Sequence, residues 1–157
     1  MGLVERLRGG NGGVKVLVRK ARAADAPEIR RLLEALGYQN SLRQVKDRLA
    51  RFRRAKAATV LVAQAGTKFA GLVSLDWFEI FHLEGFNCRM TAMIVDPEIR
   101  RQGVGRKLVA AAERVAKKAG CWRLEVTSGL KRRGAHTFYV KQGLEFTSKR
   151  FSRQLEN

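Results

Sequence analysis

Apolar residues alternate with polar ones over several short stretches of the chain, and they recur every three or four residues over several longer ones. The first pattern is typical of strands and the second of amphipathic helices. Strands are predicted at residues 14–22, 59–63, 69–78, 87–95 and 123–127. Helices are predicted from residue 25, from residue 41, after the loop that contains Gly103 and Gly105, and at residues 133–142. Residues 145–155 are expected to supply a closing strand or hairpin.

The first two helices begin with capping signals. Asp25 precedes Pro27, and Glu28 follows Asp25 by three residues, which predicts a capping box around Asp25. Ser41 is predicted to start the second helix. The apolar positions of that helix are Leu42, Val45, Leu49 and Phe52.

The stretch from Ile94 to Lys118 combines a strand end, a glycine-containing loop and an amphipathic helix. A strand end runs into Asp96, and a short loop with Gly103 and Gly105 then leads into a helix with apolar residues at helical spacing. Glycines let a backbone approach a ligand, and the first N–H groups of a helix lack intrahelical acceptors and lie at the positive end of its dipole. The glycine spacing differs from that of the dinucleotide-binding motif and of the P-loop. The loop therefore predicts an anion-binding cradle.

Arg100, Gly103 and Gly105 form the pattern R-x-x-G-x-G, which resembles the acyl-CoA pyrophosphate motif of the GNAT superfamily of N-acetyltransferases. Residues 124–126, 135–139 and 143–144 resemble a later strand, a short helix with a tyrosine, and a turn of the same family. Together the two blocks span roughly residues 94–146. The resemblance implies an α/β fold with a mixed, mostly antiparallel central sheet of six or seven strands, splayed at the centre, and helices on both faces.

The resemblance also implies a reaction. It implies acetyl-CoA as the cosubstrate, no metal, and direct transfer of the acetyl group to a primary amine of a small molecule or of a protein N-terminus or lysine. Backbone groups of the central strand would bind the pantetheine arm as an added strand would, and the loop would bind the pyrophosphate. The residues implied in these contacts are Met93, Ile94, Val95, Arg100, Arg101, Gln102, Gly103, Val104, Gly105 and Arg106.

Two residues are candidates for proton transfer. Tyr139 matches the family's tyrosine and is the expected proton donor to the departing thiolate, because donation from a pKa near 10 to one near 8.5 is uphill by only roughly 2 kcal/mol. The alternative is that its ring packs and its hydroxyl only forms a hydrogen bond. Glu125 lies on the strand beside the cleft, where some relatives that acetylate protein N-termini carry a glutamate base, but it can equally face solvent. Other candidates for the base are Glu79, His82, Glu84 and a water relay.

His136 has an ordinary pKa suited to proton transfer, but it follows three basic residues and is more simply interpreted as part of a basic edge. Many relatives carry an acidic residue where this chain has Gly134. This departure removes an expected partner of Arg133 or His136, so their family roles do not carry over directly.

The charge of the chain indicates a second candidate function. Its 32 Lys and Arg residues against 14 Asp and Glu residues give a net charge of +18. Such a field attracts nucleic acid, acidic surfaces and CoA, and it repels polycations such as aminoglycosides and polyamines. The alternative is therefore a basic RNA- or ribosome-associated binding module on a GNAT scaffold without turnover, although a basic proteome would give the same composition. The sequence has no aromatic RNA-binding motif or obvious recognition helix that favours this alternative.

The length of 157 residues, 45% of them hydrophobic, predicts a single domain over residues 14–157 after a glycine-rich flexible arm at residues 1–13. The sequence contains neither a run of roughly 20 apolar residues nor a signal peptide, so a cytoplasmic protein without membrane contact is expected. Cys88 and Cys121 are expected to be reduced, partly buried thiols. The apolar stretch Trp77–Phe86 has three possible interpretations: it forms strand ends and core, it lines a substrate pocket, or it makes a dimer contact. A monomer or homodimer is expected.

Overall fold

One five-stranded sheet forms the centre of the computed structural model, which describes residues 15–156. The strands lie in the order of the sequence: β1 Val16–Lys20, β2 Ala58–Ala65, β3 Lys68–Ile80, β4 Leu83–Val95 and β5 Cys121–Val126. The pairings from β1 to β4 are antiparallel, and β5 runs parallel to β4. This confirms a mixed, mostly antiparallel sheet. The expected N-terminal arm lies outside the described residues.

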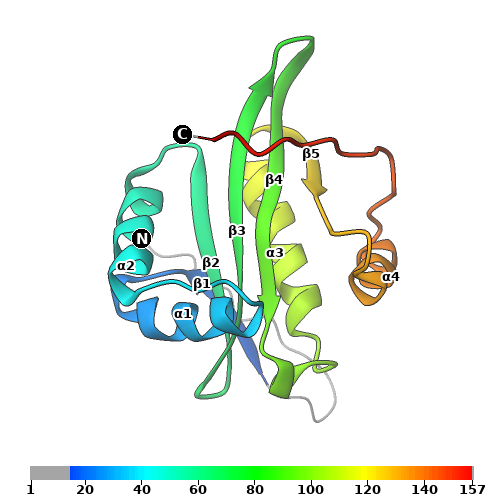
Figure 1. The fold of residues 1–157 in the computed structure, drawn as a ribbon. Coiled ribbons are helices and arrows are strands. Elements are labelled where there is room, and N and C mark those ends of the chain that lie inside the picture. Colours follow the sequence, from blue (N-terminus) through cyan, green and yellow to red (C-terminus); the bar gives the residue numbers. More distant parts are fainter. Residues whose placement is uncertain (1–14, 157) are drawn as a thin grey trace.

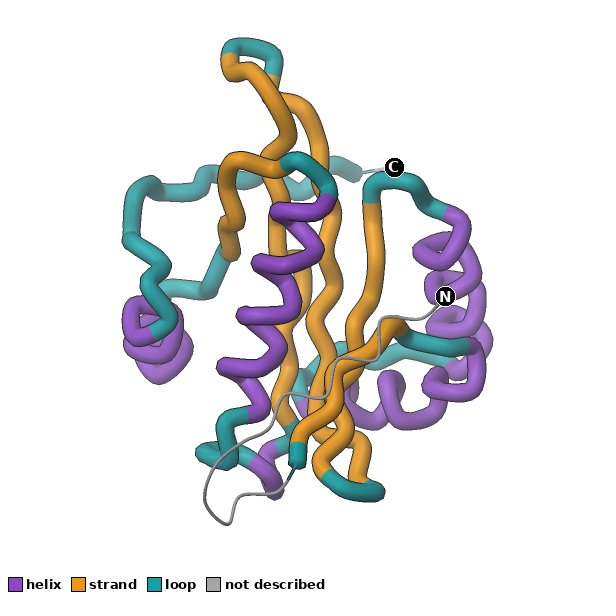
Figure 2. The backbone as a smooth tube through the Cα atoms, turned by 180° about the vertical axis from the view of Figure 1, so that it is seen from behind, coloured by secondary structure: helices purple, strands orange, loops and turns teal. Residues whose placement is uncertain are grey.

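The sheet has five strands instead of the six or seven expected, because residues 145–156 form no strand. The apolar side chains Phe146, Phe151 and Leu155 are spaced by five and four residues, so they cannot share one face of a strand. Their exposed fractions of 79%, 91% and 82% show that none is packed. The segment crosses the sheet on the face that carries the first two helices (Figures 1 and 2). The expected closing strand or hairpin was wrong.

Helices cover both faces of the sheet, as expected. Helices α1 (Ala26–Ala35) and α2 (Leu42–Arg54) lie on one face and α3 (Val104–Lys118) on the other (Figures 1 and 2). Helix α4 (Arg133–Lys141) lies beyond β5, and two short 3-10 helices, η1 (Ala23–Asp25) and η2 (Pro97–Ile99), precede α1 and α3. No helix among residues 15–156 is both long and apolar enough to cross a membrane.

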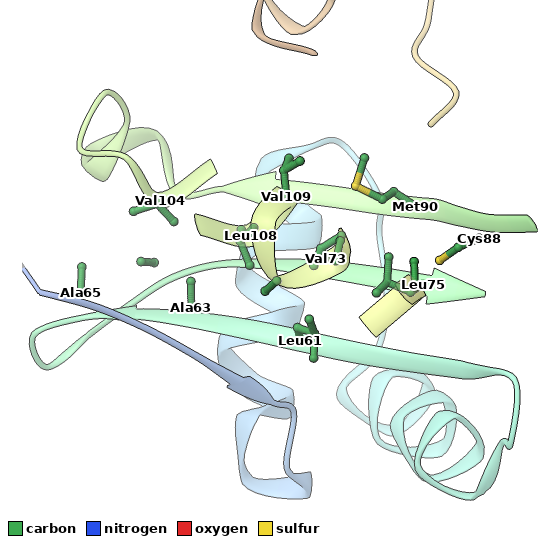
Figure 3. Packing of buried hydrophobic residues seen from close by; sticks show 14 of the residues in the cluster. Leu61, Ala63, Ala65, Val73, Leu75, Cys88, Met90, Val104, Leu108 and Val109 are labelled. Atoms are coloured by element: carbon green, nitrogen blue, oxygen red, sulfur yellow. The ribbon is translucent and has the colours of Figure 1, made fainter. Parts of the chain in front are cut away.

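Two hydrophobic clusters hold these layers together, one on the face of the sheet that carries α3 (the α3 cluster) and one on the face that carries α1 and α2 (the α1/α2 cluster). Leu108 and Val109 of α3 pack with Val73 of β3, among other residues on that face (Figure 3). The neighbouring Leu72 points to the opposite face and packs with residues of α1 and α2 such as Leu32. Each fully buried aliphatic side chain of this kind contributes about 1.5–3 kcal/mol relative to exposure. The alternation along β3 therefore ties both helical layers to one strand.

The two predicted helix starts behave differently. The Ser41 hydroxyl accepts a hydrogen bond from the Gln44 N–H at 3.1 Å, and the Gln44 side chain accepts one from the Ser41 N–H at 2.8 Å. Asp25 does not cap α1; its carboxylate instead accepts hydrogen bonds from the Arg19 guanidinium at 2.7 and 2.8 Å and from the Arg22 N–H at 2.7 Å. Burial raises the pKa of Asp25, but these hydrogen bonds outweigh it and leave the pKa below its ordinary value. An ion pair from β1 thus replaced the predicted capping box.

Candidate functional site

Strand β4 changes its pairing on both sides at one point. Ser74 of β3 pairs with Ala92, but the next residue, Leu75, pairs with Met90, so Thr91 is an extra residue and forms a β-bulge. The extra residue of a bulge lacks a partner in the ladder. On the other side, pairing with β5 ends at Met90 and Val126. Within residues 15–156, β4 therefore has no β5 partner from Thr91 to Val95, and this unpaired edge of β4, called the slot below, leaves backbone groups outside the β5 ladder.

The bulge also reverses which side chains face which helices. Cys88 and Met90 are buried in the α3 cluster, whereas Ile94, two positions further along the same alternation, is buried in the α1/α2 cluster with Ala92 packed beside it. A strand without an irregularity keeps alternate residues on one face. Thr91 supplies the one-residue shift that lets β4 serve both cores.

The strand residues implied in pantetheine binding lie along this slot. Ile94 is buried, and Met93 and Val95 are half-buried against the α3 cluster. Because these side chains are used in packing, the groups left for a ligand in the slot are the backbone N–H and C=O groups. This placement suits an extended, amide-bearing ligand that pairs as a strand does.

The loop before α3 leaves the start of that helix open. Gly103 is the N-cap residue, with a φ of +80°, and no side chain of the described residues caps the helix. Side-chain oxygens usually satisfy the first N–H groups of a helix, so a glycine cap leaves them available to an anion. Arg101 also has a positive φ of 64°, and Arg100, Arg101, Gln102 and Arg106 are exposed around the loop, while Val104 is buried. A helix start of this kind, with movable cations around it, suits the binding of an anion such as phosphate.

The two glycines of the motif have different structural roles. A Cβ on Gly103 would have no atom of the described residues within 4 Å, so the requirement there is its positive φ. A Cβ on Gly105 would lie 3.0 Å from the ring of Phe138 and 3.4 Å from Met93. Gly105 therefore lets α4 pack closely against the beginning of α3.

Tyr139 lies beside Phe138 on α4. The two rings meet edge to face with centroids 5.3 Å apart, and both pack against the α3 cluster. Burial raises the pKa of Tyr139, and the charge of Arg132 offsets part of this effect. The hydroxyl is therefore protonated at neutral pH and can donate a proton.

Glu125 faces strand β4 and is held in ion pairs. Its Oε1 accepts a hydrogen bond from the Arg89 Nε at 2.6 Å, and its Oε2 lies 3.3 Å from a terminal nitrogen of Arg123. Val126, the next residue, is the last β5 partner of β4, so Glu125 lies at the mouth of the slot. To act as a base, this carboxylate would have to accept a proton while it is engaged with two guanidinium groups.

Asp76 is a second carboxylate near the slot. The sequence prediction did not include it among the candidate residues. It lies on β3 opposite Arg89, two residues beyond Ser74 and therefore on the same face of the sheet. Its carboxylate makes no hydrogen bond to another residue within 15–156, and burial raises the pKa of Asp76, an effect that the charge of Arg89 partly offsets. The signal in the sequence was an acidic residue in a strand that is apolar on both sides of it.

The remaining candidates for the base lie elsewhere. Glu79, His82 and Glu84 are exposed in the β3–β4 hairpin, which projects beyond the rest of the sheet (Figure 1). The stretch Trp77–Phe86 is thus mostly strand, and its turn carries the fully exposed Phe81. The Nε2 of His136 lies 3.0 Å from the backbone oxygen of Gly129, between β5 and α4.

An apolar groove of about 100 Å³ adjoins the bulge on the α1/α2 face. Its lining includes Ser74 and Ala92, and the Ser74 hydroxyl lies 2.6 Å from that of Thr91. A larger, polar hollow of about 460 Å³ lies near η1 and the β2–β3 turn. Its carboxylates Asp25 and Asp96 are already paired with arginines, and it does not include the bulge.

An unpaired edge of β4 beside a strand bulge, next to a helix start with a glycine N-cap, is an arrangement that suits an extended ligand with an anionic end. Residues 26–144 match the model of the acetyltransferase (GNAT) family, and the chain belongs to this family.

One curated relative matches about half of the chain. An aminoalkylphosphonate N-acetyltransferase of Salmonella typhimurium is 33% identical over 85 residues, which cover 54% of this chain and 55% of that protein. The chain therefore matches about half the length of this curated relative.

Solved structures share the fold. A glucosamine-6-phosphate N-acetyltransferase from Arabidopsis thaliana has a TM-score of 0.79 at 21% identity, covering 90% of this chain and 99% of that one. An aminoglycoside N-acetyltransferase in complex with CoA has a TM-score of 0.82 at 15% identity, covering 94% and 99%. A transcriptional regulator from Bacillus halodurans has a TM-score of 0.81 at 18% identity, covering 89% and 99%.

Proposed function

We propose that the protein is an acetyl-CoA-dependent N-acetyltransferase that transfers an acetyl group directly to the primary amine of a small molecule. The observation that supports this most is the coincidence at Thr91, where the bulge, the end of the β5 pairing and the apolar groove meet. Family membership and the relative named for aminoalkylphosphonate acetylation support the same reaction.

The residues fit acyl-CoA at both ends of the slot. The Gly103-capped start of α3, together with Arg100, Arg101 and Arg106, would bind the pyrophosphate. The backbone of residues 93–95 would bind the pantetheine arm. When bound, acetyl-CoA supplies the thioester whose acetyl group is transferred. The unpaired backbone of the bulge is suited to donate a hydrogen bond to a carbonyl oxygen, since a fixed N–H donor needs no reorganisation.

The amine must lose a proton before it can attack. A lysine-like ammonium with a pKa near 10.4 costs roughly 4–5 kcal/mol to deprotonate at pH 7. Glu125 and Asp76 flank Arg89 on the face where an amine would approach. Asp76 is the better acceptor, because its carboxylate has no hydrogen-bond partner among the described residues, while Glu125 would give up charge-assisted hydrogen bonds. Glu125 keeps the role only if Arg89 moves.

Tyr139 is the proposed proton donor to the departing thiolate. Its raised pKa makes donation more uphill than for an ordinary tyrosine, but the proton is present across the neutral range. The ring contact with Phe138 fixes the side chain near the start of α3.

The test is thiol release from acetyl-CoA with a panel of primary amines, with acetylated products confirmed by mass spectrometry. Asp76→Asn should lower kcat by roughly 10²-fold or more if the carboxylate is the base. Glu125→Gln should then have a smaller effect, and Asp47→Asn, which changes an exposed carboxylate on α2, should have none. If no amine supports thiol release while acetyl-CoA binds, the proposal fails.

A further inference from the structure

The floor of the apolar groove is one row of residues across three strands. Ser74 of β3 is paired with Val60 of β2 on one side and with Ala92 of β4 on the other, and all three line the groove. Ala92 directly follows the bulge residue Thr91. A molecule in the groove therefore lies next to the point where β4 exposes its unpaired backbone.

The walls of the groove are hydrocarbon. Helices α1 and α2 close it with the side chains of Ile29, Leu33, Val45, Leu49 and Phe52, and Leu72 completes the lining from β3. Each methylene group that moves from water into such a lining improves affinity by about fourfold. Polyhydroxylated substrates would lose hydrogen bonds to water without gaining partners here.

The size of the groove limits the occupant. Its volume is about 100 Å³. A water molecule in the liquid occupies about 30 Å³, so the groove holds roughly three or four non-hydrogen atoms. A sugar ring with its hydroxyl groups is larger than this, whereas a short aliphatic chain fits.

Among residues 15–156, Arg48 is the only charged residue that lines the groove. It is exposed, which places it at the rim, and one of its terminal nitrogens donates a hydrogen bond to the Asn40 Oδ1 at 3.1 Å. A guanidinium group can donate two parallel hydrogen bonds to two oxygens of one carboxylate or phosphonate group. It cannot bind an ammonium group, because both groups are positively charged donors. The net charge of +18 adds to this preference by attracting anions and repelling polycations.

We propose that the groove is the acceptor subsite for a primary amine on a short aliphatic body of two to four carbons that also carries an anionic group. The aliphatic body occupies the groove, the amine lies at the Ser74 and Thr91 end next to the bulge, and the carboxylate or phosphonate reaches Arg48. This inference rests on the proposed acetyltransferase function and narrows its substrate to one chemical class.

The test compares kcat/KM for amines of equal chain length. The panel contains ω-amino carboxylates and ω-amino phosphonates, alkylamines without the anion, and a polyamine. In the parent protein the anionic amines should exceed the alkylamines by at least tenfold, and the polyamine should be poorest. Arg48→Gln should remove this advantage by raising KM for the anionic amines alone. Arg53→Gln makes the same charge change on an exposed part of α2 outside the groove and should preserve it.

A second variant tests the aliphatic part. Val60→Phe fills the groove from its floor and should raise KM for every amine by more than tenfold, while the Kd for acetyl-CoA stays within twofold of that of the parent. If amines are acetylated without preference for the anionic ones, if Arg48→Gln and Arg53→Gln behave alike, or if Val60→Phe leaves KM unchanged, the inference is overturned and the acetyltransferase function stands. If acetyl-CoA binds and no amine in any class is acetylated, both are overturned.

Discussion

Gly103→Glu is the sharpest test of the anion cradle. Its φ of +80° is costly for any residue with a side chain, by roughly 1–2 kcal/mol, so the unliganded variant should melt roughly 2–8 °C lower than the parent. The new carboxylate also lies beside the uncapped start of α3. At about 5 Å from a bound phosphate it would oppose binding by roughly 1–3 kcal/mol per unit charge, which corresponds to a roughly 5- to 150-fold loss of affinity.

Gly120→Glu is the matched control. Gly120 has a φ of +74° with open space around it, and it lies past the other end of α3, so it carries the backbone cost without the contact with the phosphate. The assay is a thermal-shift titration at about 0.15 M salt. Acetyl-CoA at a hundredfold excess over Kd adds about 2.7 kcal/mol, several degrees for a domain of this size. The parent and Gly120→Glu should show this shift and Gly103→Glu little of it. Equal shifts in the two variants would refute the cradle, and no shift in the parent would refute acetyl-CoA binding.

Further outcomes follow from single residues. Tyr139→Phe should lower kcat by roughly 10²-fold with an unchanged Kd for acetyl-CoA in single-turnover assays; unchanged turnover would remove the acid role. Burial, with a contribution from Cys121, raises the pKa of Cys88 to about 12, so at pH 8 Cys88 should react with iodoacetamide roughly 10³-fold more slowly than an ordinary thiol, and equal labelling of both cysteines by mass spectrometry would contradict its burial. The pKa of Asp25 is lower in the folded state than in the unfolded state, so the Arg19 ion pair adds stability at neutral pH that is lost as pH falls through the acidic range; the stability gap between the parent and Asp25→Asn should shrink from pH 6 to pH 3 in urea titrations. RNA binding, if the charge drives it, should weaken at least tenfold between 50 and 200 mM salt in fluorescence anisotropy, and binding that is insensitive to salt would exclude this explanation.

Local signals in the sequence predicted much of the fold. The apolar stretch before Asp96 indicated a strand, and the glycines and the helical spacing after it indicated a loop and a helix. The structure has β4, η2 and α3 at these places. Ser41 predicted the start of α2 because a capping box involves only neighbours in the chain. Asp25 failed as a cap because its partner, Arg19, comes from a strand, and the sequence does not reveal which of two neighbours a carboxylate will choose.

The candidate site depended more on register than on motif. Asp76 and Ser74 became candidates only when the β3–β4 pairing placed them opposite Arg89 and Ala92, on the two sides of the bulge at Thr91. Alternation in the sequence predicts faces for an uninterrupted strand and gives no sign of a bulge within one. The closing strand failed for a related reason, because residues 145–156 have the length of a strand but no one-sided pattern to pair with.

The bulge at Thr91 joins the fold to the proposed chemistry. Without the extra residue, Ala92 and Ile94 would follow the alternation of Cys88 and Met90 and point toward α3, leaving the α1/α2 cluster without its β4 side chains. The shift that corrects this packing also leaves one backbone unit out of the β3 ladder, and it does so where β5 stops covering the other edge of β4. Thr91 thus meets two requirements, because it lets one strand serve two cores and it leaves a backbone donor free beside the groove. A change that removed the bulge at Thr91 is therefore expected to disturb the core and the site together.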